Sequence, residues 1–323
     1  MKAHTAAGLA LALAAILTPP AHAQAFPSGP LRIILTNPPG VPNDTLARGM
    51  LESLAKTFGQ KVFIDNRIGA DGIIGADACA KAAPDGHTIC SSTAAVFSVN
   101  AVLRQKLPYD PHKDFAGVAF LGFFDSVLTV HPSITARNVQ ELLEAARAKP
   151  ESMVWGHFGV NTTGNFYQEW FRNARGARFH PVPYKTTSQT LQAVLTGEAQ
   201  VMVFSWPQLL PHLKSGKVRA LAITSDKRLP FLPDVPTFEE TGIKLPLRGW
   251  FGYHAPAAVP RPVILRWNTE IRKVAAEPWY QEKFMAPLGM SGSNWSPEEL
   301  DAFLRNHIRD MAELMKTIGI KPE

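Results

Sequence analysis

Short apolar stretches alternate with amphipathic stretches along most of the chain. The first apolar stretch, 31–35, predicts a buried strand, and the residues after the loop 37–44 predict a helix with its apolar side chains on one face. The same pair of patterns recurs as far as residues 220–224. Near the end, Ser296 and Glu299 have the spacing of a capping box that starts a further amphipathic helix. Strands that alternate with helices are typical of α/β proteins with parallel sheets, and this is the fold class that we predict.

The alternation is interrupted at two places. Two apolar strands, 117–123 and 127–131, follow each other without a helix between them, and residues 226–236 are rich in proline and charge. We interpret these places, near 124 and 225, as crossings between two lobes. Two lobes joined twice leave a cleft, which is a common place for a ligand. The expected first lobe is 24–124 with 226–323, and the expected second, inserted lobe is 125–225.

Each expected lobe places a polar loop directly before a helix. These loops are 37–44 in the first lobe and 159–165 in the second. The first N–H groups of a helix have no partner inside it, so a helix start at the carboxyl edge of a sheet suits an anion. Two such loops that face each other could hold both ends of a dicarboxylate. Every α/β unit has such a turn, however, and 37–44 lacks both the ending of an ATP-binding loop and the glycines of a dinucleotide site.

The amino-terminal residues have the pattern of an export signal. Lys2 precedes an apolar run, 6–17, that is too short to span a bilayer, and residues 21–23 fit the small-x-small cleavage rule. We therefore expect residues 1–23 to be a signal peptide and the mature, exported chain to begin near Gln24.

Two cysteines, Cys79 and Cys90, remain in the expected mature chain, where export favours oxidation. They lie on a predicted helix end and on the next strand, with the turn 84–86 between them. A disulfide is geometrically possible. The alternative is two buried thiols that act as small apolar side chains.

Charge and motifs argue against several classes of function. The net charge of +6 is spread along the chain without a basic stripe and interleaved aromatics, so nucleic acid is not an expected partner. The histidines show no metal-ligand spacing, and no G-x-S-x-G motif supplies a nucleophile. We interpret His157 and His180 as structural or exposed, and Phe166, Tyr167 and Trp170 as core rather than a ligand cage. The chain is therefore predicted to be a binding protein without metal or cofactor, and not an enzyme.

A series of short motifs, in a fixed order, extends over nearly all of the expected mature chain. The motifs are Pro30-Leu31-Arg32-Ile33-Ile34, Asp65-Asn66-Arg67-x-Gly69-Ala70-x-Gly72-x-x-Gly75-Ala76, Ala83-Pro84-Asp85-Gly86-His87-Thr88, Leu107-Pro108-Tyr109-Asp110-Pro111-x-Lys113-Asp114-Phe115, Val182-Pro183-Tyr184-Lys185, Leu210-Pro211-His212, Leu232-Pro233-Asp234-Val235-Pro236-Thr237 and Gly319-Ile320-Lys321-Pro322. By these motifs the chain resembles the tripartite tricarboxylate transporter solute receptors, the Bug-type periplasmic binding proteins.

The resemblance implies a two-lobed periplasmic-binding-protein fold of type II that closes on its ligand, in the periplasm of a Gram-negative bacterium. It implies a monomeric receptor that binds a small organic carboxylate and delivers it to membrane translocator subunits. Carried over by position, the expected ligand-binding residues are Asn37, Pro39, Gly40, Val41, Asn43, Asp44 and Thr93 from the first lobe, and Asn161, Thr162, Thr163, Asn165, Tyr184 and Phe204 from the second.

The chain departs from the family pattern within both halves of the expected site. Val41 replaces the second glycine of the first loop, Pro42 follows it, and Asn43 takes the place of a small hydroxyl residue. Because a valine disfavours positive φ, we expect a reshaped amide cradle. Phe204 stands where an acidic residue, which could pair with an ammonium group, is often found. We therefore expect an aromatic or otherwise partly apolar carboxylate rather than citrate.

Two other functions remain open at this stage, because a fold does not determine a function. One is a periplasmic accessory that reports a ligand to the sensor kinase of a two-component system, and neighbouring genes would distinguish it from a transport receptor. The other is an exported enzyme without a recognisable motif, and turnover of a bound carboxylate would support it.

Overall fold

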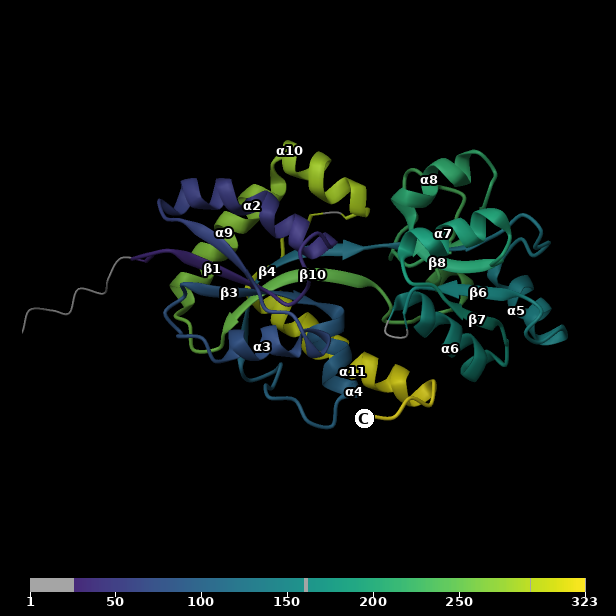
Figure 1. The fold of residues 1–323 in the computed structure, drawn as a ribbon, viewed down its shortest axis with the longest axis horizontal. Helices are drawn as coiled ribbons and strands as arrows, with labels where there is room; N and C mark the ends of the chain where they lie inside the picture. Colours follow the sequence, from purple (N-terminus) through teal and green to yellow (C-terminus); the bar gives the residue numbers. More distant parts are fainter. Residues whose placement is uncertain (1–25, 160–161, 291, 323) are drawn as a thin grey trace, which may run out of the picture.

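The computed structural model describes residues 26–159, 162–290 and 292–322, so the expected signal peptide lies outside the described residues. The described residues form two five-stranded sheets, with helices packed against each, that lie side by side along the long axis of the molecule (Figure 1). The strand order is β2-β1-β3-β10-β4 in the first sheet and β7-β6-β8-β5-β9 in the second. The predicted α/β class with two lobes is confirmed.

Segments from both ends of the chain build the first sheet and its helices. Its strands are β1 (Leu31–Leu35), β2 (Val62–Asn66), β3 (Thr88–Thr93), β4 (Phe115–Phe124) and β10 (Gly249–Pro256). Its helices are α2 (Pro42–Phe58), η1 (Ala70–Gly72), α3 (Ile73–Ala80), η2 (Ala94–Val99), α4 (Asn100–Leu103), α9 (Arg261–Ala276), α10 (Pro278–Tyr280), η4 (Gln281–Met285), η5 (Ala286–Leu288) and α11 (Pro297–Thr317). Helices α2 and α9 pack on one face of the sheet, and α3, η2 and the first half of α11 pack on the other.

The second sheet comes from the middle of the chain. Its strands are β5 (Ser126–Val130), β6 (Val154–His157), β7 (His180–Pro183), β8 (Val201–Ser205) and β9 (Arg219–Ile223). Its helices are α5 (Val139–Ala148), α6 (Thr163–Arg175), α7 (Thr187–Thr196), α8 (Trp206–Lys214) and η3 (Glu239–Thr241). Helices α5 and α6 bury their apolar faces on one side of the sheet, and α7 and α8 on the other.

Each sheet differs from the expected parallel arrangement by one antiparallel strand. Strand β10 runs antiparallel to β3 and β4, and β5 runs antiparallel to β8 and β9, whereas β1, β2 and β3 are mutually parallel, as are β6, β7 and β8. Strands β5 and β10 are the ones that bring the chain into a sheet from the other lobe. They therefore start at the edge where the neighbouring strands end, which reverses their direction.

The chain crosses between the sheets at two places. Asp125 separates β4 from β5. After β9, the next segment stays on the second sheet, where Thr237 forms a bridge to the end of β9 and Phe238 is buried in the apolar cluster of α5 and α6. Strand β10 of the first sheet begins directly after Arg248. We therefore propose Asp125 and Arg248 as the lobe boundaries.

Helix α11 contacts both lobes. Its first half buries Leu304 and Ile308 in the cluster with α3 and η2. Its second half buries Met311, Leu314 and Met315 in the cluster that contains α5 and α6. Figure 1 shows the helix, in yellow, reaching from below the first sheet toward the second. Both lobes therefore share this one helix.

A disulfide joins Cys79, at the end of α3, to Cys90 in β3, with their Cα atoms 6.0 Å apart. Both residues are fully buried. Of the two alternatives, the disulfide is therefore confirmed, and the two free thiols are excluded.

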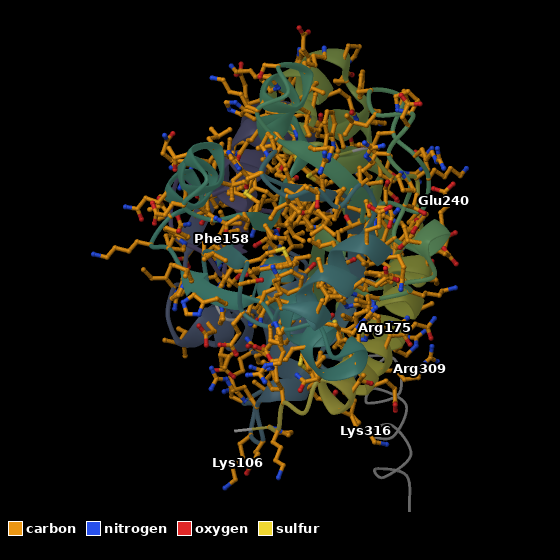
Figure 2. The ribbon with its side chains drawn as sticks, turned by 90° about the vertical axis from the view of Figure 1, so that its right-hand side faces the viewer. Lys106, Phe158, Arg175, Glu240, Arg309 and Lys316 are labelled. Carbon is orange, nitrogen blue, oxygen red and sulfur yellow. A yellow bond between two sulfur atoms is a disulfide. The ribbon has the colours of Figure 1, made fainter. Side chains whose placement is uncertain are left out.

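Charged side chains are distributed around the outside of the molecule. Figure 2 shows Lys106, Arg175, Glu240, Arg309 and Lys316 at different places along the outline. Among the described residues, no helix is long and apolar enough to cross a membrane.

Candidate ligand-binding site

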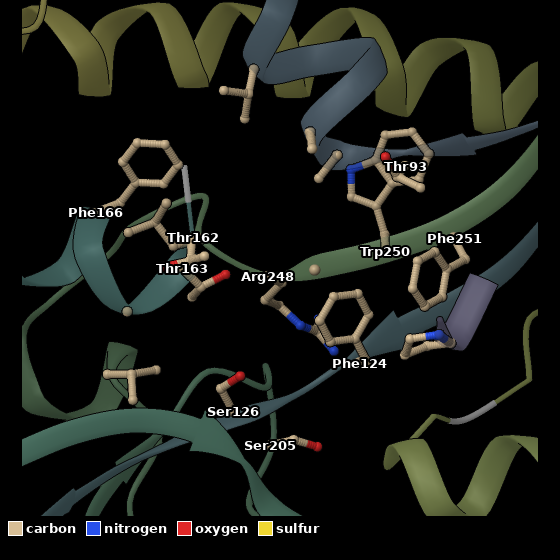
Figure 3. Close-up of a pocket in the computed structure, with 18 of the residues that line it drawn as sticks. Thr93, Phe124, Ser126, Thr162, Thr163, Phe166, Ser205, Arg248, Trp250 and Phe251 are labelled. Atoms are coloured by element: carbon tan, nitrogen blue, oxygen red, sulfur yellow. The ribbon is translucent and has the colours of Figure 1, made fainter. Parts of the chain in front are cut away.

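A cavity of about 520 Å³ lies between the two sheets (Figure 3). Its walls come from both lobes, from the two crossing segments and from α11. A volume of this size lies within the usual range for small-molecule sites, roughly 300–1,000 Å³. Seven of the predicted site residues line it: Asn37, Val41, Asn43, Thr93, Thr162, Thr163 and Phe204.

Helix α2 begins at the cavity. Its N-cap residue is Val41, which has an extended conformation with φ −77° and ψ 162°, and Pro42 occupies the first helical position, where proline is favoured. The positive φ that we expected to be costly at Val41 is instead adopted by Gly40, at +85°. Because a valine side chain has no hydrogen-bond acceptor, it cannot cap the first N–H groups of α2. The first N–H groups of α2 therefore lack a side-chain cap at the end of the helix that borders the cavity.

A polar network that includes two lining residues, Asn37 and Asn43, holds this loop in place. Asn43 Nδ2 donates to Asn37 Oδ1 at 3.1 Å and to Ser91 Oγ at 3.0 Å. Asp44 accepts from the Gly40 N–H at 2.9 Å and pairs with Arg48 Nε at 2.8 Å.

The network fully occupies the carboxylate of Asp44. Burial raises the pKa of Asp44, but the hydrogen bonds from Arg48, Gly40 and Asn66 outweigh it, and the net pKa is lowered. Pro39, Gly40 and Asp44 do not line the cavity in the described part of the chain. Asp44 and Gly40 therefore shape the loop.

A second helix start, that of α6, faces the cavity from the other lobe. Thr162 is its N-cap, and its Oγ1 accepts from the Asn165 N–H at 3.4 Å and donates to the Gly159 carbonyl at 2.7 Å. Thr162, Thr163 and Gly164 line the cavity, whereas Asn165 lies one turn behind them. The expected site residue Asn161 lies outside the described residues.

A third helix start lies at the end of β3. Thr93 is the N-cap of η2, and its Oγ1 accepts from the Val96 N–H at 3.3 Å. Thr93, Ala94 and Ala95 line the cavity. Because η2 continues directly into α4, three helices begin at the cavity, two from the first lobe and one from the second.

Of the two remaining expected site residues, Phe204 lines the cavity and Tyr184 does not. Phe204, near the end of β8, lines the cavity and lies edge-on to Phe158, with ring centroids 6.4 Å apart. Tyr184 is not one of the described residues that line the cavity. Its hydroxyl donates to Glu198 Oε1 at 3.0 Å, and burial together with this bond raises its pKa to about 12.

Aromatic residues that the sequence reasoning missed form much of the wall. Phe124 and Phe251 stack with their ring centroids 5.0 Å apart, and Phe158 and Trp250 also line the cavity. Phe166, interpreted as core, is buried and lines the cavity as well. The sequence could have predicted Phe124, Trp250 and Phe251 as lining residues. They lie where the chain crosses between the lobes, and such segments must border the cleft.

Among the described residues that line the cavity, Arg248 is the one with a charged side chain at neutral pH. Its positive charge is already paired with carboxylates. Its Nε and Nη2 donate to the two oxygens of Asp125 at 2.9 and 3.1 Å, and Nη1 pairs with Asp226. The guanidinium also lies 4.0 Å from the ring centroid of Phe123. Thr224 Oγ1 donates to Asp125 at 3.1 Å. Both crossings between the lobes are thus tied together by one bidentate ion pair.

No group of three or more potential metal ligands occurs within the described ranges. His157, interpreted as structural, is buried, and its Nδ1 lies 3.1 Å from the Gly159 carbonyl. His180 is exposed.

The model of the tripartite tricarboxylate transporter family receptor matches residues 46–320. The chain belongs to this family. Its members are periplasmic solute receptors that bind carboxylates and are not enzymes, which confirms the predicted binding role.

Relatives of this receptor extend over almost its whole length. BugT of Bordetella pertussis is 30% identical and aligns over 97% of this chain and 96% of its own. A protein from the tcbD–tcbE intergenic region of Pseudomonas sp. strain P51 is 33% identical over 91% of this chain and 88% of its own.

Solved structures of the same kind superpose on the receptor. Rpa4515 of R. palustris with adipate has a TM-score of 0.73 at 27% identity and covers 92% of this chain and 100% of its own. The periplasmic binding protein BugD has a TM-score of 0.72 at 29% identity with the same coverage. MatC from Rhodopseudomonas palustris with bound malate has a TM-score of 0.70 at 26% identity and covers 90% of this chain and 99% of its own.

Proposed function

We propose that this receptor binds a small carboxylate with an aromatic or otherwise apolar body and delivers it to a tripartite tricarboxylate transporter. The observation that carries the proposal is that three helix starts meet at a cavity whose remaining walls are largely aromatic. The helix starts suit the carboxylate, and the aromatic walls suit the body.

The helix starts favour an anion for two reasons. Their first N–H groups have no acceptor within the helix, and the helix dipole places partial positive charge there. In α2, Val41 leaves these N–H groups uncapped. The lining arginine, Arg248, is neutralised by Asp125 and Asp226, so it adds little attraction for a second or third carboxylate. This arrangement favours a ligand with one anionic end over citrate.

The aromatic side chains of the lining favour an apolar body. Four phenylalanines line the cavity, namely Phe124, Phe158, Phe166 and Phe251. Phe204 adds a further ring at the position where an acidic side chain could have held an ammonium group. Removing apolar area from water stabilises a complex by about 25 cal/mol per Å², so a ligand with a ring gains more here than a polar acid of equal size.

The two-lobed fold supports delivery by closure. A ligand that contacts α2 and η2 from one lobe and α6 from the other stabilises the closed arrangement, because only that arrangement provides all three helix starts. We further propose export through a cleaved signal peptide, as the amino-terminal pattern predicts, and a monomeric receptor.

Isothermal titration calorimetry with benzoate, terephthalate, adipate, malate and citrate tests the ligand class. We expect one or both aromatic acids to bind at least about tenfold more tightly than citrate, a difference of about 1.4 kcal/mol. Tight binding of citrate together with no binding of either aromatic acid would refute the proposal. Mass spectrometry of small molecules released from the purified protein is an independent check on the same class.

The transport role has its own test. Uptake of the bound acid should be lost when the gene for the receptor is deleted and restored when it is returned. Unchanged uptake, with the gene beside a two-component pair, would instead favour the sensing accessory.

A further inference from the structure

We propose that Trp250 and His307 form a second polar subsite in the cavity, which holds a hydroxyl group on the apolar body of the ligand. The inference rests on the proposed function, because it adds a specificity-determining pair to the same cavity. Trp250 lies in β10 and His307 in α11, and both line the cavity. Figure 3 shows the indole nitrogen of Trp250 on the edge of the ring that lies toward Phe166 and Thr162 in this view.

Both side chains are buried and carry polar atoms without a partner. The exposed fraction is 0% for Trp250 and 6% for His307. Among the described residues, Trp250 Nε1 has no hydrogen-bond partner, and His307, whose ring interacts with the Pro246 carbonyl, keeps at least one ring nitrogen without one. An unsatisfied buried donor or acceptor costs about 1–3 kcal/mol, and native structures retain few of them. A ligand group that hydrogen-bonds to both side chains at once therefore gains an advantage here.

Packing holds the two rings in fixed positions. The rings of Trp250 and His307 are perpendicular, with centroids 6.1 Å apart. Phe303 packs against both, at 5.5 Å from Trp250 and 5.2 Å from His307. Phe120 adds a contact on the indole at 6.2 Å. The subsite is thus preorganised, so little conformational entropy is lost when a ligand binds to it.

The chemistry of the pair selects a neutral group. Burial lowers the pKa of His307 to about 4, although the nearby Pro246 carbonyl acts in the opposite direction, so the imidazole is neutral at physiological pH. The indole only donates, whereas a neutral imidazole has one donor and one acceptor nitrogen. A hydroxyl can accept from the indole N–H and donate to the imidazole acceptor at the same time. A second carboxylate would find one donor, the indole N–H, together with the lone pair of the imidazole acceptor and no compensating charge.

Matched pairs of aromatic acids test the subsite by calorimetry. The probes are 3- and 4-hydroxybenzoate against 3- and 4-methylbenzoate, because a methyl group has about the size of a hydroxyl but forms no hydrogen bond. For the wild type we expect one hydroxy acid to bind at least about tenfold more tightly than its methyl counterpart. In Trp250→Phe and His307→Phe that ratio should fall to about twofold or less, while affinity for the methyl acid changes little.

Trp267→Phe is the matched control. Trp267 is also fully buried, but its Nε1 donates to the Gly86 carbonyl at 2.9 Å, and it packs under α2, away from the cavity lining. This variant should lose stability and keep the hydroxyl preference. An unchanged hydroxyl-to-methyl ratio in both Trp250→Phe and His307→Phe, or a wild type that prefers the methyl acids, overturns the subsite and leaves the proposed ligand class intact. If none of the four acids binds and citrate does, the ligand class and the subsite fail together.

Discussion

Replacing Val41 with serine would add the side-chain cap that α2 lacks. The backbone of Val41 already has the extended conformation of an N-cap residue, and its carbonyl accepts from the Thr45 N–H at 3.0 Å. A serine hydroxyl at this position can accept from the N–H of Asn43 or Asp44 without any backbone change. The cap and a bound carboxylate would then compete for the same donors.

The serine cap should therefore raise the stability of the protein and lower its affinity for the ligand. A serine N-cap stabilises a protein by roughly 1 kcal/mol relative to a residue that cannot cap. A charge-assisted hydrogen bond is worth about 1.5–3 kcal/mol, so sharing one donor with the cap should cost a ligand about half of that. We therefore expect V41S to unfold at higher urea concentration and to bind the tightest acid of the panel about four- to tenfold more weakly, since 1.4 kcal/mol corresponds to a factor of ten.

V41A is the control, because it removes the same apolar atoms without adding an acceptor. Urea unfolding and calorimetry on both variants give the two quantities. If V41S is more stable than V41A but binds the ligand equally well, the N–H groups of α2 do not hold the carboxylate, and the argument from the uncapped helix is wrong.

Three further predictions concern stability. Removing Asp125 (D125A) takes away the buried partner of Arg248 and should lower the free energy of unfolding by about 3 kcal/mol. Removing the exposed partner (D226A) should cost less than about 1 kcal/mol. Equal losses in urea unfolding would contradict this. Replacing both cysteines of the α3–β3 disulfide with alanine should cost about 2–4 kcal/mol in the same assay, and an unchanged unfolding midpoint would disprove it. Burial lowers the pKa of His254 to about 3 and of His307 to about 4, so the unfolded chain takes up protons that the folded chain does not between about pH 6.5 and 4. Stability should fall by about 2 kcal/mol per histidine from pH 7 to 5 in urea unfolding at a series of pH values, and a free energy of unfolding that does not change over this range would contradict the prediction.

Much of the architecture was predictable because it depends on local patterns. The capping box of Ser296 and Glu299 is present at the start of α11, and the helix begins at Pro297. The loops before α2 and α6 face one cavity, and the cysteine pair forms a disulfide. Strand direction was not predictable in the same way. Alternation of apolar residues identifies a strand, but it does not say from which lobe the chain enters the sheet.

The site was predictable only in part, for a similar reason. The family pattern identifies loop positions, but it does not distinguish residues that face a ligand from residues such as Asp44 that hold the loop. Trp250 and His307 come from distant parts of the chain and meet only through the packing of α11 against β10. Tyr184 follows β7 at the edge of the second sheet, and its hydroxyl is used by Glu198.

Helix α11 has a consequence for how the receptor opens. A stiff helix that packs on both lobes cannot move as a rigid body with each of them, so separation of the lobes requires sliding along one half. The half that packs near α6 carries Met311 and Met315, whose unbranched side chains adapt to a shifting surface with little strain. Opening should therefore proceed as a shear along these methionines combined with a bend at Asp125 and Arg248. His307 lies one turn before Met311, so the same sliding would change the shape of the cavity as the lobes part.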